Sequence, residues 1–177
     1  MLRDGPSALT SRAVTTEAGV AKGVLHRHFA DFDAFLAELV LDRVDRMDPQ
    51  MMALLESAGT GTVADNLTGA LTALFGSIAV AIVSLITFRD ELRARLRQTW
   101  PAGVPVLTEA VVMIGSYLTA ERAWGRIRED ADIDALAPTL IGAAHLLFAD
   151  RTAPPPDAAD VRKVVSAVIA GAIEEPR

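Results

Sequence analysis

The side chains with the clearest capacity for chemistry lie in residues 10–29, whose sequence is TSRAVTTEAGVAKGVLHRHF. On a helix of 100° per residue, Lys22 and His26 lie within about 40° of each other, with Gly23 and Arg27 beyond them. Such a face offers hydrogen-bond donors and positive charge beside a glycine that lets a backbone approach closely. It suits phosphate oxygens and the edges of bases in a major groove.

Other chemistry finds little support. His26 and His28, followed by Asp31, suggest a metal, but side chains two residues apart on a helix point about 200° from each other, which is poor ligand geometry. No zinc-protease, phosphate-loop or nucleophile-elbow motif occurs. Glu121 and the nearby Trp124 are expected on a solvated or partly buried helix face. We therefore expect no metal, no cofactor and no enzyme activity.

Two short helices would position the polar face. Thr10 is a good N-cap for a helix over residues 11–18, Gly19 stands where a helix stops, and a second helix follows over about 21–29. Val20 is expected to plug the turn, and Ala18 is expected to point inward. Helix, turn and helix of these lengths form a helix-turn-helix layout.

At this point the segment resembles the tetracycline-repressor (TetR) family of bacterial regulators. The resemblance implies an all-α homodimer with an N-terminal DNA-binding domain and a larger C-terminal domain that binds a small effector and dimerises. The matching residues are Leu9, Thr10, Arg12, Val14, Ala18, Gly19, Val20, Lys22, Gly23, Leu25, Arg27, His28, Phe29, Phe35 and Leu36.

Eight residues are expected to contact operator DNA. Lys22 is the best candidate for a guanine edge, Gly23 would allow close approach of the backbone, and His26 could donate or accept with a pH-sensitive charge. The remaining five are expected at phosphates or an outlying base: Thr10, Ser11, Arg12, Arg27 and His28.

The chain also departs from the family. The family has a full helix before Leu9, and only residues 1–6 stand there, so the helix that would cover Leu25 and Phe29 is expected to be truncated or its start misassigned. Phe32 occupies the place of a Lys that commonly anchors a phosphate. These departures leave an alternative open: the same fold acting as a ligand- or partner-binding module without sequence-specific DNA binding.

Composition and charge agree with a basic head on an acidic helical body. Hydrophobic residues make up 51% of the 177 and aromatic residues only 5%, which argues against an all-β fold. Residues 1–29 carry four basic and two acidic side chains, and the remainder carries 13 basic and 21 acidic ones. With no cysteine, disulfides and thiolate sites are excluded, and a reducing cytoplasm is the expected compartment.

Helical spacing continues through the rest of the chain. The uncharged stretch 66–88 is expected to be one central helix covered on all sides, with a membrane span as the less favoured alternative. We therefore expect a helix-turn-helix DNA-binding domain over 1–47 and an effector-binding and dimerisation domain over 48–177. Further expected helices cover 33–47, 92–98, 105–127, 133–150 and 157–173, with a loop over 57–62.

Six side chains, most of them apolar and one with a hydroxyl group, could line a pocket for an effector or could be ordinary core. The last helix carries an apolar stripe of Val and Ile residues over 161–169, which predicts a four-helix homodimer interface through 133–150 and 157–173. The predicted function is that of a ligand-responsive transcriptional regulator, a repressor released from its operator by a small apolar or amphipathic effector. The effector candidates are Phe75, Phe88, Met113, Tyr117, Trp124 and His145.

Overall fold

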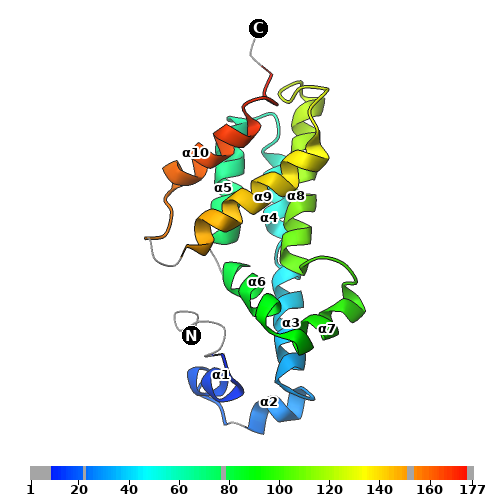
Figure 1. The fold of residues 1–177 in the computed structure, drawn as a ribbon, viewed down its shortest axis with the longest axis vertical. Helices are drawn as coiled ribbons and strands as arrows, with labels where there is room; N and C mark the ends of the chain where they lie inside the picture. Colours follow the sequence, from blue (N-terminus) through cyan, green and yellow to red (C-terminus); the bar gives the residue numbers. More distant parts are fainter. Residues whose placement is uncertain (1–8, 22, 77–78, 151–153, 175–177) are drawn as a thin grey trace. The chain divides into compact units, whose positions relative to one another are not determined.

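In the computed structural model, the described residues are 9–21, 23–76, 79–150 and 154–174, and every element named in these ranges is a helix. The all-α prediction is therefore confirmed, and Figure 1 shows the order of the helices along the chain. Their bounds are α1 Ser11–Glu17, α2 Gly23–His28, α3 Phe32–Asp45, α4 Asp48–Glu56, α5 Val63–Phe75, α6 Ala79–Phe88, α7 Asp90–Thr99, α8 Pro105–Ala123, α9 Ile133–Ala149 and α10 Ala158–Ile169.

The prediction of a single helix over 66–88 is wrong. Helix α5 ends at Phe75 with Gly76 as its C-cap, and α6 begins at Ala79. Glycine is a poor helix former, so an uncharged run that includes Gly76 has a natural place to break. Among the described residues no single helix is both long and apolar enough to cross a membrane, although α5 and α6 pass that test of length and composition together.

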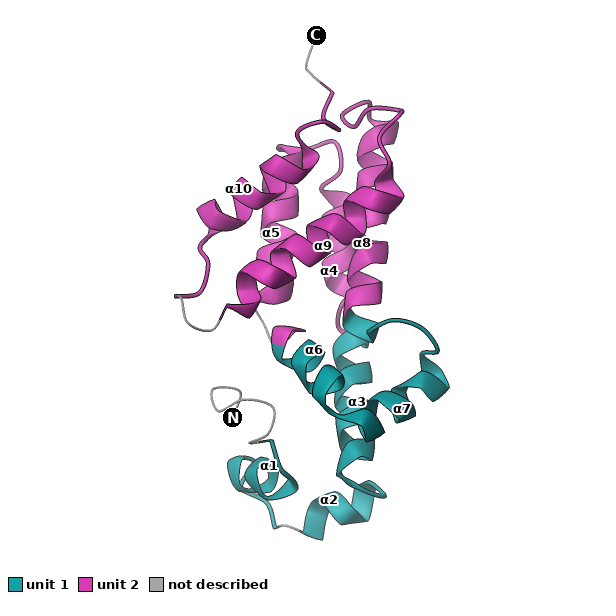
Figure 2. Cartoon of the chain, in the orientation of Figure 1, with its two compact units in different colours: residues 1–45, 81–106 teal, residues 46–80, 107–177 magenta. Residues whose placement is uncertain are grey.

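The chain divides into two compact units, coloured separately in Figure 2. The first contains residues 1–45 and 81–106, and the second contains 46–80 and 107–177. The first unit thus joins the helix-turn-helix segment to α7 and to most of α6, which lie far along the sequence. Helices that belong to this unit therefore come from two separate stretches of the sequence.

In the first unit, α3 and α7 pack against each other. Leu36 and Val40 on α3 are fully buried, as is Leu92 on α7, and Leu96 follows one turn later with 3% exposure. Both helices repeat apolar residues at four-residue spacing, which gives each one a face for the other. Through this apolar contact α7 supports α3, and the helix-turn-helix segment packs on α3 through α2.

In the second unit, α10 packs against both α5 and α9. Asp157 caps α10 by accepting from the backbone of Ala159 and Asp160, and the Asp160 carboxylate completes a capping box. The apolar stripe predicted for this helix is largely used inside the chain, because Val165 and Ile169 are buried. The stripe is therefore not by itself evidence for a dimer interface.

Candidate nucleic-acid interface and effector core

Local hydrogen bonds define α1 and the turn that follows it. The Thr10 hydroxyl accepts from the Ala13 backbone at 3.2 Å, which confirms Thr10 as the N-cap. Gly19 has a φ of +65°, and the backbones of Gly19 and Val20 donate to the carbonyls of Thr16 and Thr15. This is the Schellman ending, and it needs a residue that tolerates the left-handed region at Gly19.

The inner face of this turn differs from the expected one. Val20 is 43% exposed and Ala18 is exposed, so neither plugs the turn. Instead the buried residue of α1 is Thr15, whose hydroxyl donates to the Ser11 and Arg12 carbonyls at 3.0 and 3.2 Å. A threonine can be buried there because the preceding turn of its own helix accepts its hydrogen bond.

Helix α2 presents the predicted polar face to solvent. Gly23, His26, Arg27 and His28 are all exposed, and no residue of the helix is fully buried. Lys22, the best base-reading candidate, lies outside the described residues, as do residues 1–8, to which the expectation of a truncated first helix applies. The structure therefore places four of the five candidates of this helix together on its exposed surface.

The three remaining candidates lie at the start of α1. Thr10 and Arg12 are exposed, and Ser11 is half-buried. The Ser11 hydroxyl oxygen is buried without a hydrogen-bond partner in the described part of the chain. Arg12 is the one charged side chain among these three residues and is exposed, whereas the Thr10 hydroxyl already serves the helix as its cap.

The corner between α2 and α3 contains contacts that the sequence did not predict. Asp31 caps α3 by accepting from the Ala34 backbone at 2.7 Å. Phe32 holds the place of the expected lysine, and the Arg89 guanidinium lies 5.5 Å from the centre of its ring. The charge that the sequence lacks at position 32 is thus supplied from 57 positions along the chain.

The six effector candidates fall into a buried group and an exposed one. Phe75, Met113 and Tyr117 are buried, with 2%, 2% and 0% exposure. The Phe75 ring lies edge-on to His145 at 5.9 Å between centroids. His145 Nε2 is buried without a hydrogen-bond partner among the described residues, and burial lowers the pKa of this imidazole.

The other two candidates are exposed. Phe88, which belongs to the first unit, is 77% exposed, and Trp124 is 67% exposed. The Trp124 indole lies over Gly59, so close that a Cβ at that glycine would be 3.0 Å from the ring. Neither side chain is part of a buried core, and their role toward an effector stays a prediction.

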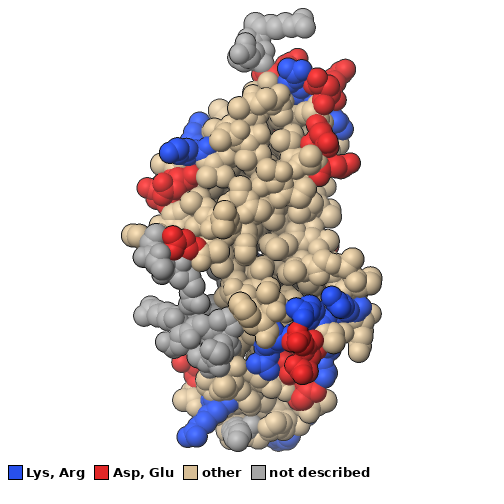
Figure 3. Space-filling view, in the orientation of Figure 1, with Lys and Arg blue, Asp and Glu red and all other residues tan. Residues whose placement is uncertain are grey.

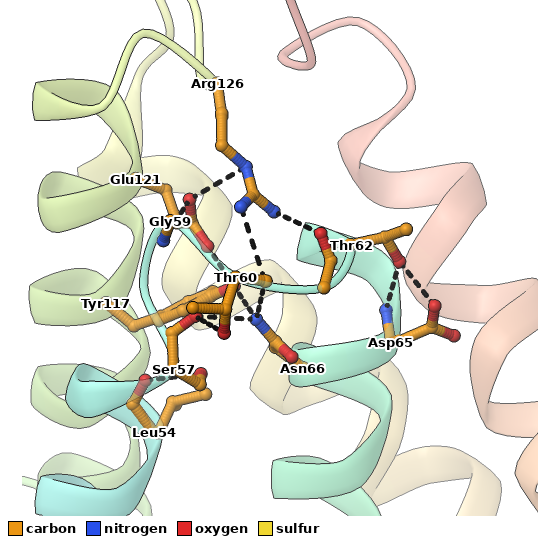
Figure 4. A network of polar contacts seen from close by, with 11 residues as sticks. Leu54, Ser57, Gly59, Thr60, Thr62, Asp65, Asn66, Tyr117, Glu121 and Arg126 are labelled. Atoms are coloured by element: carbon orange, nitrogen blue, oxygen red, sulfur yellow. Dashed lines mark hydrogen bonds and ion pairs between the residues drawn. The ribbon is translucent and has the colours of Figure 1, made fainter.

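A buried polar network that the sequence did not predict occupies the second unit (Figure 4). Glu121 has no exposed surface, contrary to the solvated or partly buried face expected for it. Its carboxylate accepts from the Tyr117 hydroxyl and from the Gly59 backbone at 3.3 Å, and it pairs with Arg126 Nε at 3.2 Å. Burial and the hydrogen bond to Glu121 raise the pKa of Tyr117. A buried carboxylate is tolerable here because each oxygen has a donor.

The same network fastens the loop between α4 and α5. Arg126 donates to the carbonyls of Thr60 and Gly61 at 3.3 and 3.1 Å. Asn66 donates from its amide nitrogen to the Thr60 carbonyl at 2.9 Å and to the Tyr117 hydroxyl at 3.0 Å. Tyr117 therefore has both a donor and an acceptor within the protein, so its hydroxyl is not free to meet a ligand in this arrangement.

Taken together, these features define an all-α protein with an N-terminal helix-turn-helix. Residues 1–39 match the family model described as bacterial regulatory proteins, tetR family. Over that segment the chain is similar to the TetR family of regulators. A comparison with curated proteins gives no match.

Solved structures extend the likeness of the fold over nearly the whole chain. A TetR-family regulator from Agrobacterium tumefaciens has a TM-score of 0.72 at 14% identity, with 98% of this chain and 92% of that chain covered. The ketosteroid transcriptional regulator KstR2 of Mycobacterium tuberculosis gives 0.62 at 20%, covering 96% and 87%. The regulator FadR from Bacillus subtilis, solved with stearoyl-CoA, gives 0.62 at 18%, covering 94% and 88%.

Proposed function

We propose that this protein is a ligand-responsive, DNA-binding transcriptional regulator that represses until an effector binds. The observation that carries the proposal is the coincidence of the family match with a helix-turn-helix whose second helix exposes Gly23, His26, Arg27 and His28. An exposed helix of this kind can enter a major groove, while the start of α1 meets phosphates. Lys22 remains the proposed base-reading residue.

Selection from a randomised pool of double-stranded DNA tests this function. The unmodified chain should enrich one sequence with two related half-sites. On that duplex, Lys22→Ala should weaken binding by about 1–3 kcal/mol and relax preference at one position. Glu17→Ala, an exposed change at the end of α1, is the matched control and should leave the preference intact. Equal loss on every sequence would instead make Lys22 a phosphate contact.

The effector is proposed to bind in the second unit beside Phe75, Met113 and His145. Support comes from the burial of Phe75 and Met113, from the Phe75 ring beside His145, and from one polar atom, His145 Nε2, that has no partner among the described residues. Such a site favours an apolar or amphipathic molecule with a single hydrogen-bonding group. The effector would shift the population toward a conformation whose two heads no longer fit adjacent grooves.

Mass spectrometry of compounds that co-purify with the chain tests the effector site. A bound apolar molecule should be lost in Met113→Trp, which fills the proposed space, and retained in Met52→Trp, a control at a residue that is 55% exposed. The molecule added back should release the selected duplex from the unmodified chain only. Release from both variants alike would place the effector elsewhere.

Dimerisation through residues 133–150 and 157–173 remains part of the proposal, on apolar side chains of these helices that are not buried inside the chain. Leu146 is 75% exposed on α9, and Val168 lines a groove of about 520 Å³ together with Leu136. These apolar surfaces are suited to a second copy of the same helices. Leu146→Glu combined with Val168→Glu should give a folded monomer in analytical ultracentrifugation. A dimer of unchanged strength would exclude this face.

The second candidate function is a ligand- or partner-binding module without sequence-specific DNA binding. Phe32 favours it, because the phenyl ring cannot anchor the phosphate that the family's lysine commonly anchors. The selection experiment separates the two functions. A chain that retains a co-purified effector but enriches no DNA sequence would be the binding module.

A further inference from the structure

A column of aromatic rings leads from the end of α2 to the start of α7, within the first compact unit. Phe29, which follows α2 directly, meets Phe35 edge-on at 5.3 Å between centroids. Phe35 stacks on Phe32 at 5.7 Å, and the Arg89 guanidinium lies over Phe32 at 5.5 Å. Each contact is within the range at which rings and cations attract one another.

Two ion pairs flank this column. Arg89 Nε donates to Asp33 Oδ1 at 2.8 Å, and Arg95 donates from its guanidinium to Asp31 Oδ2 at 2.6 Å. The arginines lie on the α7 side and the carboxylates at the start of α3, and Figure 3 shows the two signs of charge side by side over these helices. Asp31 takes part both in an ion pair and in a helix cap, since its other oxygen accepts from the backbone of Ala34 at the start of α3.

These contacts matter because, among the described residues, α2 packs only lightly on its neighbours α1 and α3. It is six residues long and buries no residue fully. A helix this short is not stable by itself in water, so the segments around it must set its geometry. The Asp33–Arg89 pair is 19% and 29% exposed, which makes it less screened by solvent than a fully exposed pair.

We propose that Arg89 and Arg95 are positioning residues for DNA recognition. They hold the corner formed by Asp31, Phe32 and Asp33, and through Phe35 and Phe29 they hold the direction of α2, without contacting DNA themselves. The inference rests on the proposed function. Where the family commonly places a phosphate-anchoring lysine, this chain has a ring that receives a cation from a distant helix.

The duplex selected by the unmodified chain is the probe. Arg89→Ala should weaken its binding by about tenfold, because the ion pair and the ring contact are lost together. Arg89→Lys keeps a cation near Phe32 and should recover most of that loss. The matched control is Arg93→Ala, since Arg93 pairs with Asp90 in its own helix and does not reach α3. It should bind like the unmodified chain.

The dependence of affinity on salt separates positioning from direct contact. If Arg89 positions α2, the slope of log affinity against log salt should be the same for Arg89→Ala and the unmodified chain. A slope smaller by about one would make Arg89 a phosphate contact and overturn the inference. Equal affinity of Arg89→Ala and Arg93→Ala would overturn it as well.

Amide exchange tests, without DNA, whether the contacts of Arg89 and Arg95 with the corner at Asp31, Phe32 and Asp33 hold α2 in place. We call these contacts the brace. Exchange over residues 23–28 should be several-fold faster in Arg89→Ala than in Arg93→Ala, while α8 keeps its protection, which shows that the variant is folded. Equal exchange over 23–28 would overturn the brace even if DNA is bound. If the unmodified chain selects no DNA sequence, the proposed function fails, and the exchange result then decides whether the structural brace stands.

Discussion

The two compact units hold their polar side chains in opposite ways. In the first unit, α2 carries its polar residues on the surface and is braced at one end by surface ion pairs and stacked rings. In the second unit, Tyr117 and Glu121 lie inside the bundle and are saturated with hydrogen bonds. A surface brace yields to small perturbations, whereas a buried network resists them until the unit unfolds.

Amide exchange should show the largest contrast between the units. Backbone amides of α2 should exchange more than about a thousandfold faster than those at the centre of α8, because α2 opens locally and α8 opens only with its unit. Mass spectrometry of peptides covering 23–28 and 110–118 measures both. Similar protection of the two peptides would remove the distinction between a braced and a buried helix.

Removing the buried carboxylate should cost the next largest amount. Glu121→Ala leaves the Tyr117 hydroxyl and Arg126 Nε without their carboxylate partner and should lower the free energy of unfolding by about 3 kcal/mol in urea titrations. Glu121→Gln keeps the shape and should cost less. Asp130→Ala breaks an exposed pair with Arg128 and should leave stability unchanged within error. If Glu121→Ala behaved like Asp130→Ala, the network would not contribute to stability.

Replacing one glycine in each unit by alanine compares the backbone conformations that the two units require. Gly19→Ala should destabilise the head by about 1 kcal/mol, because φ is +65° and an L-residue is strained there even though no atom is within 4 Å. Gly69→Ala on α5 has the same open surroundings with ordinary helical geometry and should stabilise by about 0.5–1 kcal/mol. Effects of the same sign would contradict this reasoning.

The smallest expected effect concerns His145. Burial lowers its pKa in the folded chain, so the unfolded chain takes up a proton more readily. The folded state therefore keeps its full stability above the ordinary pKa of histidine and loses part of it as pH falls through and below that value. Between pH 7.5 and 5.5, His145→Phe should lose less stability than the unmodified chain in thermal melts. An identical pH dependence would show that His145 titrates normally.

The sequence alone determined the features that depend on neighbours along the chain. Thr10 and Asp157 begin α1 and α10 because each cap accepts hydrogen bonds from residues two or three positions ahead. Gly19 ends α1 because a left-handed residue is needed one step beyond the helix. These local rules were sufficient to predict the helix-turn-helix.

Only the tertiary structure decided what covers each residue. The last helix uses Val165 inside the chain, and Glu121 is buried in a network with a distant loop, because burial depends on which segments pack together. Arg89 meets Asp33 across 56 residues, and no periodicity along the sequence encodes that distance. Local hydrogen bonds need only the next turn of chain, whereas a brace or a buried charge exists only when a remote partner has been folded into place.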